Sequence, residues 1–209
     1  MLAESAAIKS DAFKSLYEEY GAPVLSQAMA YHSRHEGISR VRKIEYCHKH
    51  FLGIEPDRRQ LDGLCRRYSE AVKKAVIDCP WVEGAKPLLQ AVSDRIDCFI
   101  VSGTPGNELK DIVKARNMGS FFKGVYGSPR LKEDIVSDVL KRFHYDVNAC
   151  VFIGDAMTDY DAAKILNMNF IGRVFPGKKS PFPEGTRTIT DLHGLCDEII
   201  RNEQGLSND

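Results

Sequence analysis

The chain has 209 residues, enough for one core domain and a small accessory domain. Its hydrophobic fraction of 43% and charged fraction of 28% are typical of a soluble globular protein. Because 29 basic side chains balance 29 acidic ones, the composition argues against a broad nucleic-acid-binding surface, although it allows a small basic pocket. No apolar run approaches the roughly 20 residues that cross a membrane, and the first five residues lack the pattern of a signal peptide. We therefore expect neither nucleic acid nor a membrane as a partner.

The six cysteines are scattered and form no Cys-x-x-Cys pair. In a chain of this size they are expected to be reduced and mostly buried. This pattern predicts a cytoplasmic protein.

The first 80 or so residues are predicted to be helical, without a convincing strand. Ser10 or Asp11 can cap a first helix, for which Gly21 is the stop signal. Ser39 can cap a third helix, and Pro56 suits the first turn of a fourth. The four helices are expected at about 10–20, 23–32, 39–53 and 56–78, with a loop at 35–38.

After Cys79-Pro80, helices alternate with short apolar runs. Such runs, bounded by turn residues, suit strands that are buried on both faces of a sheet. Their alternation with helices predicts a doubly wound parallel α/β sheet built from right-handed crossovers. The strands are expected at 98–101, 124–126, 150–153 and 169–172, and the helices at 84–94, 105–117, 131–143, 157–166 and from 191 onward.

Polar residues follow the first two predicted strands, at the sheet edge where ligands of parallel sheets bind. Ser102-Gly103-Thr104 offers a hydroxyl and closely spaced backbone N–H groups that can hold a phosphate at a helix N-terminus; the alternative is an ordinary turn. Lys132 opens a helix, where a cation opposes the helix dipole. Its position suggests a nearby carboxylate or phosphate, and the alternative is a solvated lysine.

Two aspartates follow the third predicted strand, in the run Gly154-Asp155-Ala156-Met157-Thr158-Asp159. Asp155 emerges at the strand end, and Asp159 lies four residues later in the first turn of the next helix. Two such carboxylates can hold Mg²⁺, which takes oxygen ligands and keeps several waters. The alternative is structural, with Asp155 capping the helix and Asp159 favouring its dipole.

In this order, Ser102, Lys132 and the Gly-Asp-x-x-x-Asp run resemble the second, third and fourth motifs of the haloacid dehalogenase superfamily. The resemblance covers nearly the whole chain, because residues 80–84 resemble that family's return from cap to core. It implies a Rossmann-like α/β core whose first strand is missing, together with an all-helical cap. The implied division is a cap over 1–80, with the remnant of the first core loop at 1–8, and a core over 81–209.

The first motif of that family, Asp-x-Asp-Gly-x, is absent from the sequence. In the family its first Asp is the nucleophile, which forms an aspartyl-phosphate, and its second is the general acid and base. Met1-Leu2-Ala3-Glu4-Ser5 resembles the continuation of the motif, with Met1 where the family has Val. We hypothesise that a GTG valine codon was read as the start, which the in-frame upstream DNA would test. Natural loss of the motif is the alternative.

In the family, the missing strand lies at the sheet centre, between the strands at 98–101 and 150–153. Without it, two central edges are exposed and the core contains a hole. We expect those strands to close up, another segment or chain to fill the gap, or the fold to be partly disordered. The exposed edges also predict self-association.

The segment His35-Glu36-Gly37-Ile38-Ser39-Arg40 resembles the substrate loop of the phosphoglycolate phosphatase and beta-phosphoglucomutase branch. The resemblance implies that Arg40 holds an anionic group of the substrate, with Lys43 as the second candidate. The alternative is a solvated helical turn capped by Ser39.

The resemblance implies a Mg²⁺-dependent phosphatase that acts on a small phosphorylated metabolite such as a sugar phosphate or phosphoglycolate. The implied site residues are Asp155 and Asp159 for Mg²⁺, Ser102 and Lys132 for catalysis, and Gly103, Thr104 and Arg40 for the substrate. Without the nucleophile, the 209-residue chain is expected to be inactive. The alternatives are a sugar phosphomutase and a pseudoenzyme that binds phosphometabolites or a partner protein.

Overall fold

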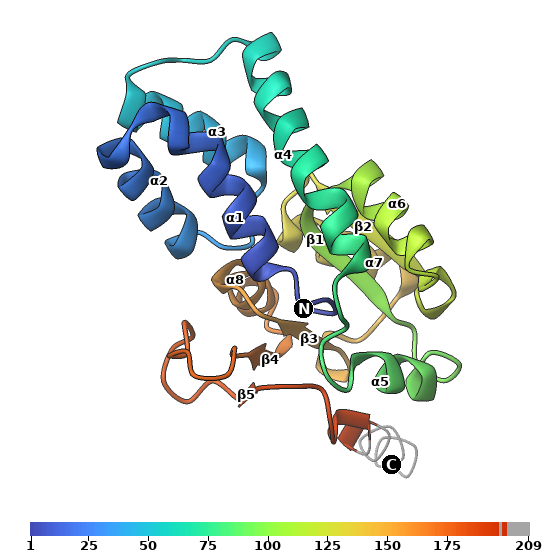
Figure 1. The fold of residues 1–209 in the computed structure, drawn as a ribbon. Coiled ribbons are helices and arrows are strands. Elements are labelled where there is room, and N and C mark those ends of the chain that lie inside the picture. Colours follow the sequence, from blue (N-terminus) through green and yellow to red (C-terminus); the bar gives the residue numbers. More distant parts are fainter. Residues whose placement is uncertain (197, 200–209) are drawn as a thin grey trace.

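The computed structural model describes residues 1–196, 198 and 199, and it has a helical part and an α/β part (Figure 1). The helical part contains α1 (Ala6–Tyr17), η1 (Glu18–Tyr20), α2 (Ala22–Arg34), α3 (Arg40–Cys47), η2 (His48–Leu52) and α4 (Arg58–Asp78). The α/β part contains α5 (Ala85–Val92), β1 (Phe99–Pro105), α6 (Gly106–Ala115), η3 (Gly119–Phe121), β2 (Gly124–Ser128), α7 (Lys132–Phe143), η4 (Val147–Ala149), β3 (Val151–Gly154), α8 (Met157–Ile165), β4 (Asn169–Arg173) and β5 (Thr188–Ile189). Across this described part of the chain, every helix is too short or too polar to span a bilayer.

The helical part follows the predicted order, with corrections at three helix boundaries. The helix α1 begins at Ala6, so Ser10 lies inside it and is not its cap. The predicted third helix changes to a π-helical turn at His48 before it ends at Gly53, which has a left-handed φ of 67°. The fourth helix begins after Pro56, because Asp57 and Gln60 form a capping box there.

The apolar face of α1 anchors the helical part. Phe13 and Tyr17 are almost completely buried, and they pack with Ile44 of α3 and Val72 of α4. Burial of large side chains of this kind stabilises a fold by roughly 1.5–3 kcal/mol each. The core of the helical part therefore fixes α1 against α3 and α4, which places Lys9 on α1 and Lys43 on α3 close to the α/β part.

The α/β part contains the predicted parallel strands, but its sheet is split in two. Strand β1 pairs with β2, and β3 pairs with β4, which pairs with the short β5. Sequence analysis missed β5, because its two residues are too short for a periodic signal. The helix predicted from Asp191 extends into residues outside the described part of the chain.

The two central strands do not close up. In the described part of the chain, β1 and β3 belong to separate sheets, and residues 1–4 run between them (Figure 1). The backbone of this segment pairs with residues 80–82, through a bridge between Ala3 and Trp81 and a 3.0 Å bond from the Val82 N–H to the Leu2 carbonyl. The side chains of Leu2 and Trp81 pack against the apolar clusters of both half-sheets. The start of the chain thus occupies part of the space between the two central edges.

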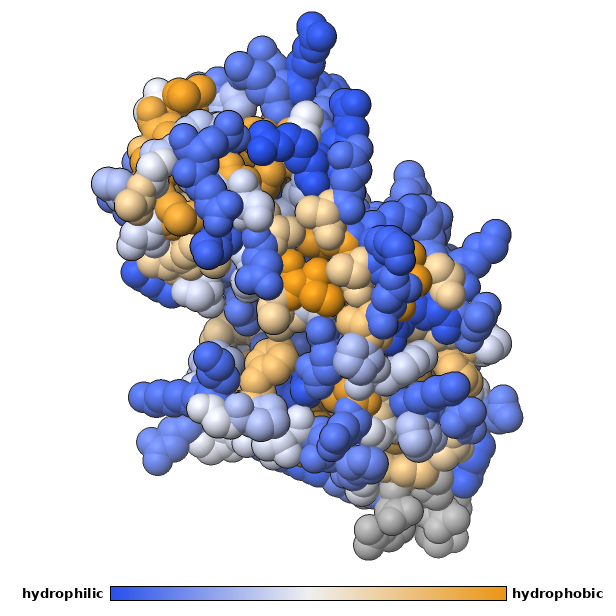
Figure 2. Space-filling view, in the orientation of Figure 1, coloured by the Kyte–Doolittle hydropathy of each residue, from blue (hydrophilic) through white to orange (hydrophobic). Residues whose placement is uncertain are grey.

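The helical part and the α/β part meet across an apolar surface. Figure 2 shows apolar side chains gathered where the two parts join, whereas the outer surface is mostly hydrophilic. This junction also carries the charged residues described next.

Candidate functional site

A buried ion pair joins the start of α7 to the start of α8. Lys132 Nζ lies 2.6 Å from Asp159 Oδ1 and donates to Thr158 Oγ1 at 2.8 Å. The other carboxylate oxygen of Asp159 accepts the backbone N–H groups of Asp155 and Ala156, at 3.2 and 3.1 Å. Lys132 and Asp159 are only 8% and 5% exposed. The anion that the sequence predicts beside Lys132 is therefore Asp159, which holds the ammonium in a fixed position.

Asp155 has a different cationic partner. Its Oδ2 lies 2.7 Å from the amino group of Met1. Burial disfavours the ionised form, but this ammonium is close enough to lower the pKa of Asp155 to about 2. The carboxylate at the end of β3 is therefore charged, and it attracts a cation.

The two aspartates do not form a complete Mg²⁺ site. Asp155 offers carboxylate oxygens to a cation, whereas Asp159 is engaged by Lys132 and two backbone amides. Over the residues that the structure describes, no cluster of three or more His, Cys, Asp or Glu side chains could hold a metal. Asp155 fits the role of a single Mg²⁺ ligand, and the remaining ligands would have to come from elsewhere.

The segment Ser102–Thr104 lies within β1, at an irregularity where the register with β2 shifts between Ser102 and Pro105. Ser102 Oγ accepts the backbone N–H of Thr104 at 3.2 Å, and the strand continues to Pro105. The predicted turn after Val101 is therefore an irregularity of the strand, which runs four residues further than the sequence predicts. Phosphate binding by Ser102 and Thr104 stays a prediction.

The loop between α2 and α3 lies directly on the site. Gly37 has a φ of +83°, and a side chain there would collide with Thr158 and lie 3.1 Å from Lys132 Nζ. A side chain at Gly103 would collide with the Gly37 carbonyl. These contacts need glycine at both positions, because only a residue without Cβ allows the two backbones to approach so closely.

Arg40 binds the α/β part of the same chain. Its guanidinium donates to both carboxylate oxygens of Glu108, at 2.8 and 2.6 Å, and also contacts Ser69. Ser69 donates to Glu108 at 2.7 Å, and the guanidinium lies 4.5 Å from the centre of the Tyr68 ring. A substrate role for Arg40 stays a prediction, but in this conformation Arg40 connects α3 to α6. Sequence analysis missed Glu108, because an acidic residue in a first helical turn is explained by the helix dipole alone.

Four more ionisable groups lie at the same junction, and sequence analysis singled out only Lys43. Burial lowers the pKa of Lys9, against the attraction of Asp155, and lowers that of Lys43 to about 8. Burial raises the pKa of Glu36 and lowers that of His32 to about 4. No signal marked Lys9, because a lysine on an amphipathic helix is usually solvated.

Because His32 is buried, we expect the free energy of unfolding to fall in acid. Its ring stacks on Phe13, and its nitrogens lie 3.1 Å from Ser10 Oγ and 3.4 Å from Lys43 Nζ. Burial, together with the charges of Lys43 and Lys9, lowers the pKa of His32 from 6.5 to about 4, so the unfolded chain binds the proton more tightly. Stability from the neutral ring is present above pH 6.5 and is lost as the pH falls to 4, by about 3 kcal/mol in total.

Urea denaturation at pH 7.5 and pH 4.5 would measure this loss. His32→Gln should show a smaller difference between the two pH values than the unchanged chain, because the variant has no imidazole to protonate. An equal difference in both proteins would contradict the assignment.

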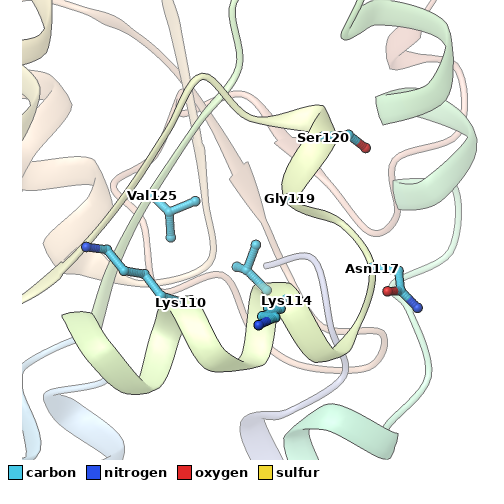
Figure 3. A pocket seen from close by; sticks show the side chains of 7 residues that line it. Lys110, Lys114, Asn117, Gly119, Ser120 and Val125 are labelled. Atoms are coloured by element: carbon cyan, nitrogen blue, oxygen red, sulfur yellow. The ribbon is translucent and has the colours of Figure 1, made fainter.

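A separate hollow of about 400 Å³ lies beside α6 and η3 (Figure 3). Its lining residues are Lys110, Val113, Lys114, Asn117, Gly119, Ser120 and Val125. It shares no residue with the site around Lys132 and Asp155. We therefore assign no part of the chemistry to this hollow.

Comparisons with known proteins support the fold. A predicted phosphatase from Clostridium acetobutylicum is 16% identical, with a TM-score of 0.71, over 96% of this chain and 94% of that one. A protein described as a HAD-hydrolase, YfnB from Bacillus subtilis bound to magnesium, is 16% identical, with a TM-score of 0.69, over 96% and 94%. CbbY from Rhodobacter sphaeroides, in complex with xylulose-(1,5)bisphosphate, is 14% identical, with a TM-score of 0.70, over 93% and 91%. No curated protein matched.

At these identities the likenesses show a shared fold alone. Membership rests on a family model, described as haloacid dehalogenase-like hydrolase, which matches residues 1–173. That match spans both parts of the fold and includes the segments that carry Ser102, Lys132 and Asp155. The chain belongs to the haloacid dehalogenase-like hydrolase family.

Proposed function

We propose that the chain belongs to a Mg²⁺-dependent phosphatase that acts on a small phosphorylated metabolite. The observation that carries the proposal is the fixed ammonium of Lys132, which is buried beside the carboxyl end of β3. A preorganised cation stabilises phosphoryl charge better than a mobile one, because it need not reorganise during the reaction. In this proposal α1 to α4 form the cap, and residues from about 81 onward form the core.

Lys132 has hydrogen-bonding capacity left for a phosphate. An ammonium has three N–H donors, and Thr158 and Asp159 accept from two of them. The third donor would bind a phosphate oxygen, and Ser102 with the Thr104 backbone would bind a second. Asp155 would hold Mg²⁺, which neutralises phosphoryl charge when it is bound.

The 209 residues lack one essential part of this chemistry. The sequence contains no Asp-x-Asp-Gly, the motif whose first Asp is the nucleophile in the family that the sequence resembles. We therefore expect the chain to bind phosphate without turning over phosphate esters.

Phosphate release and phosphate binding test this proposal together. With Mg²⁺ and a panel of phosphomonoesters, the purified chain should release no phosphate above background. Calorimetric titration should show binding of inorganic phosphate, weakened about 10- to 100-fold in Lys132→Met, because one charge-assisted hydrogen bond and its charge are lost. Thermal melts would establish that the variant is folded.

Lys141→Met is the matched control, since Lys141 is an exposed lysine on the same helix. This variant should bind phosphate like the unchanged chain. Turnover by the unchanged chain would overturn the expected inactivity. Equal phosphate binding by the two variants would overturn the role of Lys132.

A further inference from the structure

A second hollow lies in the helical part, between η1, η2 and the first half of α4. Its volume is about 340 Å³, and its wall is mostly apolar, with Tyr20, Ile54 and Leu64 among the lining side chains. Small-molecule sites in proteins are mostly apolar hollows of about 300 Å³ or more that contain a few polar groups. This hollow therefore has a suitable size and lining for a molecule with a single ring system.

A buried histidine in the wall of this hollow has one ring nitrogen that the fold does not use. His48 is 5% exposed, and its Nδ1 lies 3.0 Å from the Ile44 carbonyl and 3.1 Å from the Tyr17 hydroxyl. Because a carbonyl can only accept, the contact with Ile44 assigns the proton to Nδ1 and leaves Nε2 as an acceptor. Burial lowers the pKa of His48, which keeps the ring neutral near neutral pH.

The Nε2 atom of His48 is open to the hollow. Among the described side chains that are not exposed, Arg116 Nε is the one nitrogen or oxygen that is fully buried without a partner. No hydrogen bond from the same residues reaches His48 Nε2, so this atom keeps contact with solvent, and the hollow that His48 lines provides that contact. An acceptor in this position favours a ligand that brings a hydroxyl or an N–H group to it.

A cation without an anionic partner lies at the same hollow. Arg59 and Arg67 both line it from α4, and Arg67 pairs with Glu19 at 3.1 Å. Arg59 is exposed, and no carboxylate of the described residues forms an ion pair with it. A guanidinium can bind a carboxylate through two parallel hydrogen bonds. The hollow therefore combines an apolar wall, an acceptor and a cation.

A glycine of α4 keeps the hollow open. Gly63 lies inside the helix, where glycine is less favourable than alanine. A Cβ at Gly63 would meet no atom within 4 Å, so packing within this chain does not require glycine there. A side chain at this position would extend into the hollow that Gly63 lines. The glycine thus provides space for a ligand at a cost to the helix.

We propose that this hollow binds a small aromatic carboxylic acid that carries a hydroxyl or a ring N–H group. The ring packs between Tyr20 and Leu64, the carboxylate binds Arg59, and the hydroxyl or N–H donates to Nε2 of His48. The inference does not rest on the proposed function, because the hollow shares no residue with the site around Lys132.

Calorimetric titration with 4-hydroxyphenylacetate, 4-hydroxybenzoate and indole-3-acetate tests the site. At least one of these probes should bind with a dissociation constant below about 1 mM. Excess inorganic phosphate should leave this affinity unchanged, because phosphate is expected at Lys132. The amide of the best probe lacks the charge, and phenylacetate, benzoate or 1-methylindole-3-acetate lacks the donor. Each of these two analogues should bind about 10-fold more weakly than the best probe.

Two substitutions would locate the bound probe. Gly63→Leu fills the hollow and should weaken binding at least about 10-fold, and the higher helix propensity of leucine keeps α4 folded. Arg59→Gln should weaken binding of the acid about 10-fold and change the affinity for its amide less than about 2-fold. Asp62→Leu and Arg66→Gln are the matched controls, because both positions are exposed on α4 and neither lines the hollow. Both control variants should bind like the unchanged chain, and thermal melts would establish that all four variants are folded.

Four results would overturn this inference and leave the proposed function standing. In the first, none of the three probes binds. In the second, Gly63→Leu binds the best probe as well as the unchanged chain does. In the third, inorganic phosphate displaces the probe, which would place the probe at Lys132 instead. In the fourth, no probe binds and Gly63→Leu abolishes self-association in size-exclusion chromatography, which would make a second copy of the chain the occupant.

Discussion

Adding a β-strand that ends in Asp-x-Asp-Gly ahead of Met1 is expected to raise Mg²⁺-dependent phosphate release at least about 10³-fold over the 209-residue chain. The added strand has a place to bind, because in the described part of the chain β1 and β3 each have one edge that pairs with no other strand, and residues 1–4 occupy only part of the gap between the two sheets. The extension would also convert the amino group of Met1 into an amide and so remove the cation that lies 2.7 Å from Asp155. Asp155 would then be free to bind a metal ion. Phosphate release from a panel of phosphomonoesters would measure the effect.

The matched control is the same extension with Asn in place of its first Asp. Both extended chains should melt at a higher temperature than the 209-residue chain, because the strand fills the hole in the core. Only the chain with Asp should release phosphate. If both extended chains are stabilised and neither releases phosphate from any substrate, the phosphatase proposal is wrong and a phosphometabolite-binding protein becomes the better account.

Glu108→Ala is expected to lower the free energy of unfolding by about 3–5 kcal/mol. The substitution leaves the guanidinium of Arg40 buried at the junction of the two parts without its carboxylate, and it removes the acceptor of Ser69. A buried charge without a partner keeps its desolvation cost and loses its compensation. Urea denaturation, followed by circular dichroism, would measure the change.

Two comparisons isolate this effect. The double variant Arg40→Met with Glu108→Leu should recover most of the lost stability, because it removes both charges and keeps the volume. Asp111→Ala removes a second ion pair between α4 and α6, from Asp111 to Lys73 at 2.6 Å, but both of its partners are exposed. That variant should leave the free energy of unfolding almost unchanged. A cost for Asp111→Ala as large as that for Glu108→Ala would contradict the importance of burial.

The sequence predicted the fold well because its signals were local. Alternating apolar runs and helices defined the parallel strands, and Gly21 and Gly53 marked helix ends. The failures also have local causes. Ser10 is a predicted cap that lies inside α1, which begins at Ala6, and the two residues of β5 are too few to show a period.

The site was only partly predictable, because its pairings cross between elements. The spacing of Asp155 and Asp159 suggested two ligands of one metal, but the structure gives them separate cationic partners. The ion pair of Arg40 with Glu108 joins residues 68 positions apart. No local sequence pattern in α3 or α6 indicates that Arg40 and Glu108 pair. The environment of Lys9 could not be predicted for the same reason, since the charged groups that act on it come from distant segments of the chain.

The loop that carries Gly37 bears on every affinity measured at the site around Lys132. Gly37 lies against Lys132 and Gly103, so we expect a phosphate that reaches Lys132 to displace it. If the loop covers Lys132 in about 99% of the molecules, the apparent dissociation constants would be about 100-fold higher than the intrinsic ones. This penalty is the same for every ligand that requires the same displacement. It therefore cancels in the ratio of two affinities, and selectivity between matched ligands reports on the site more directly than the strength of binding to any one of them.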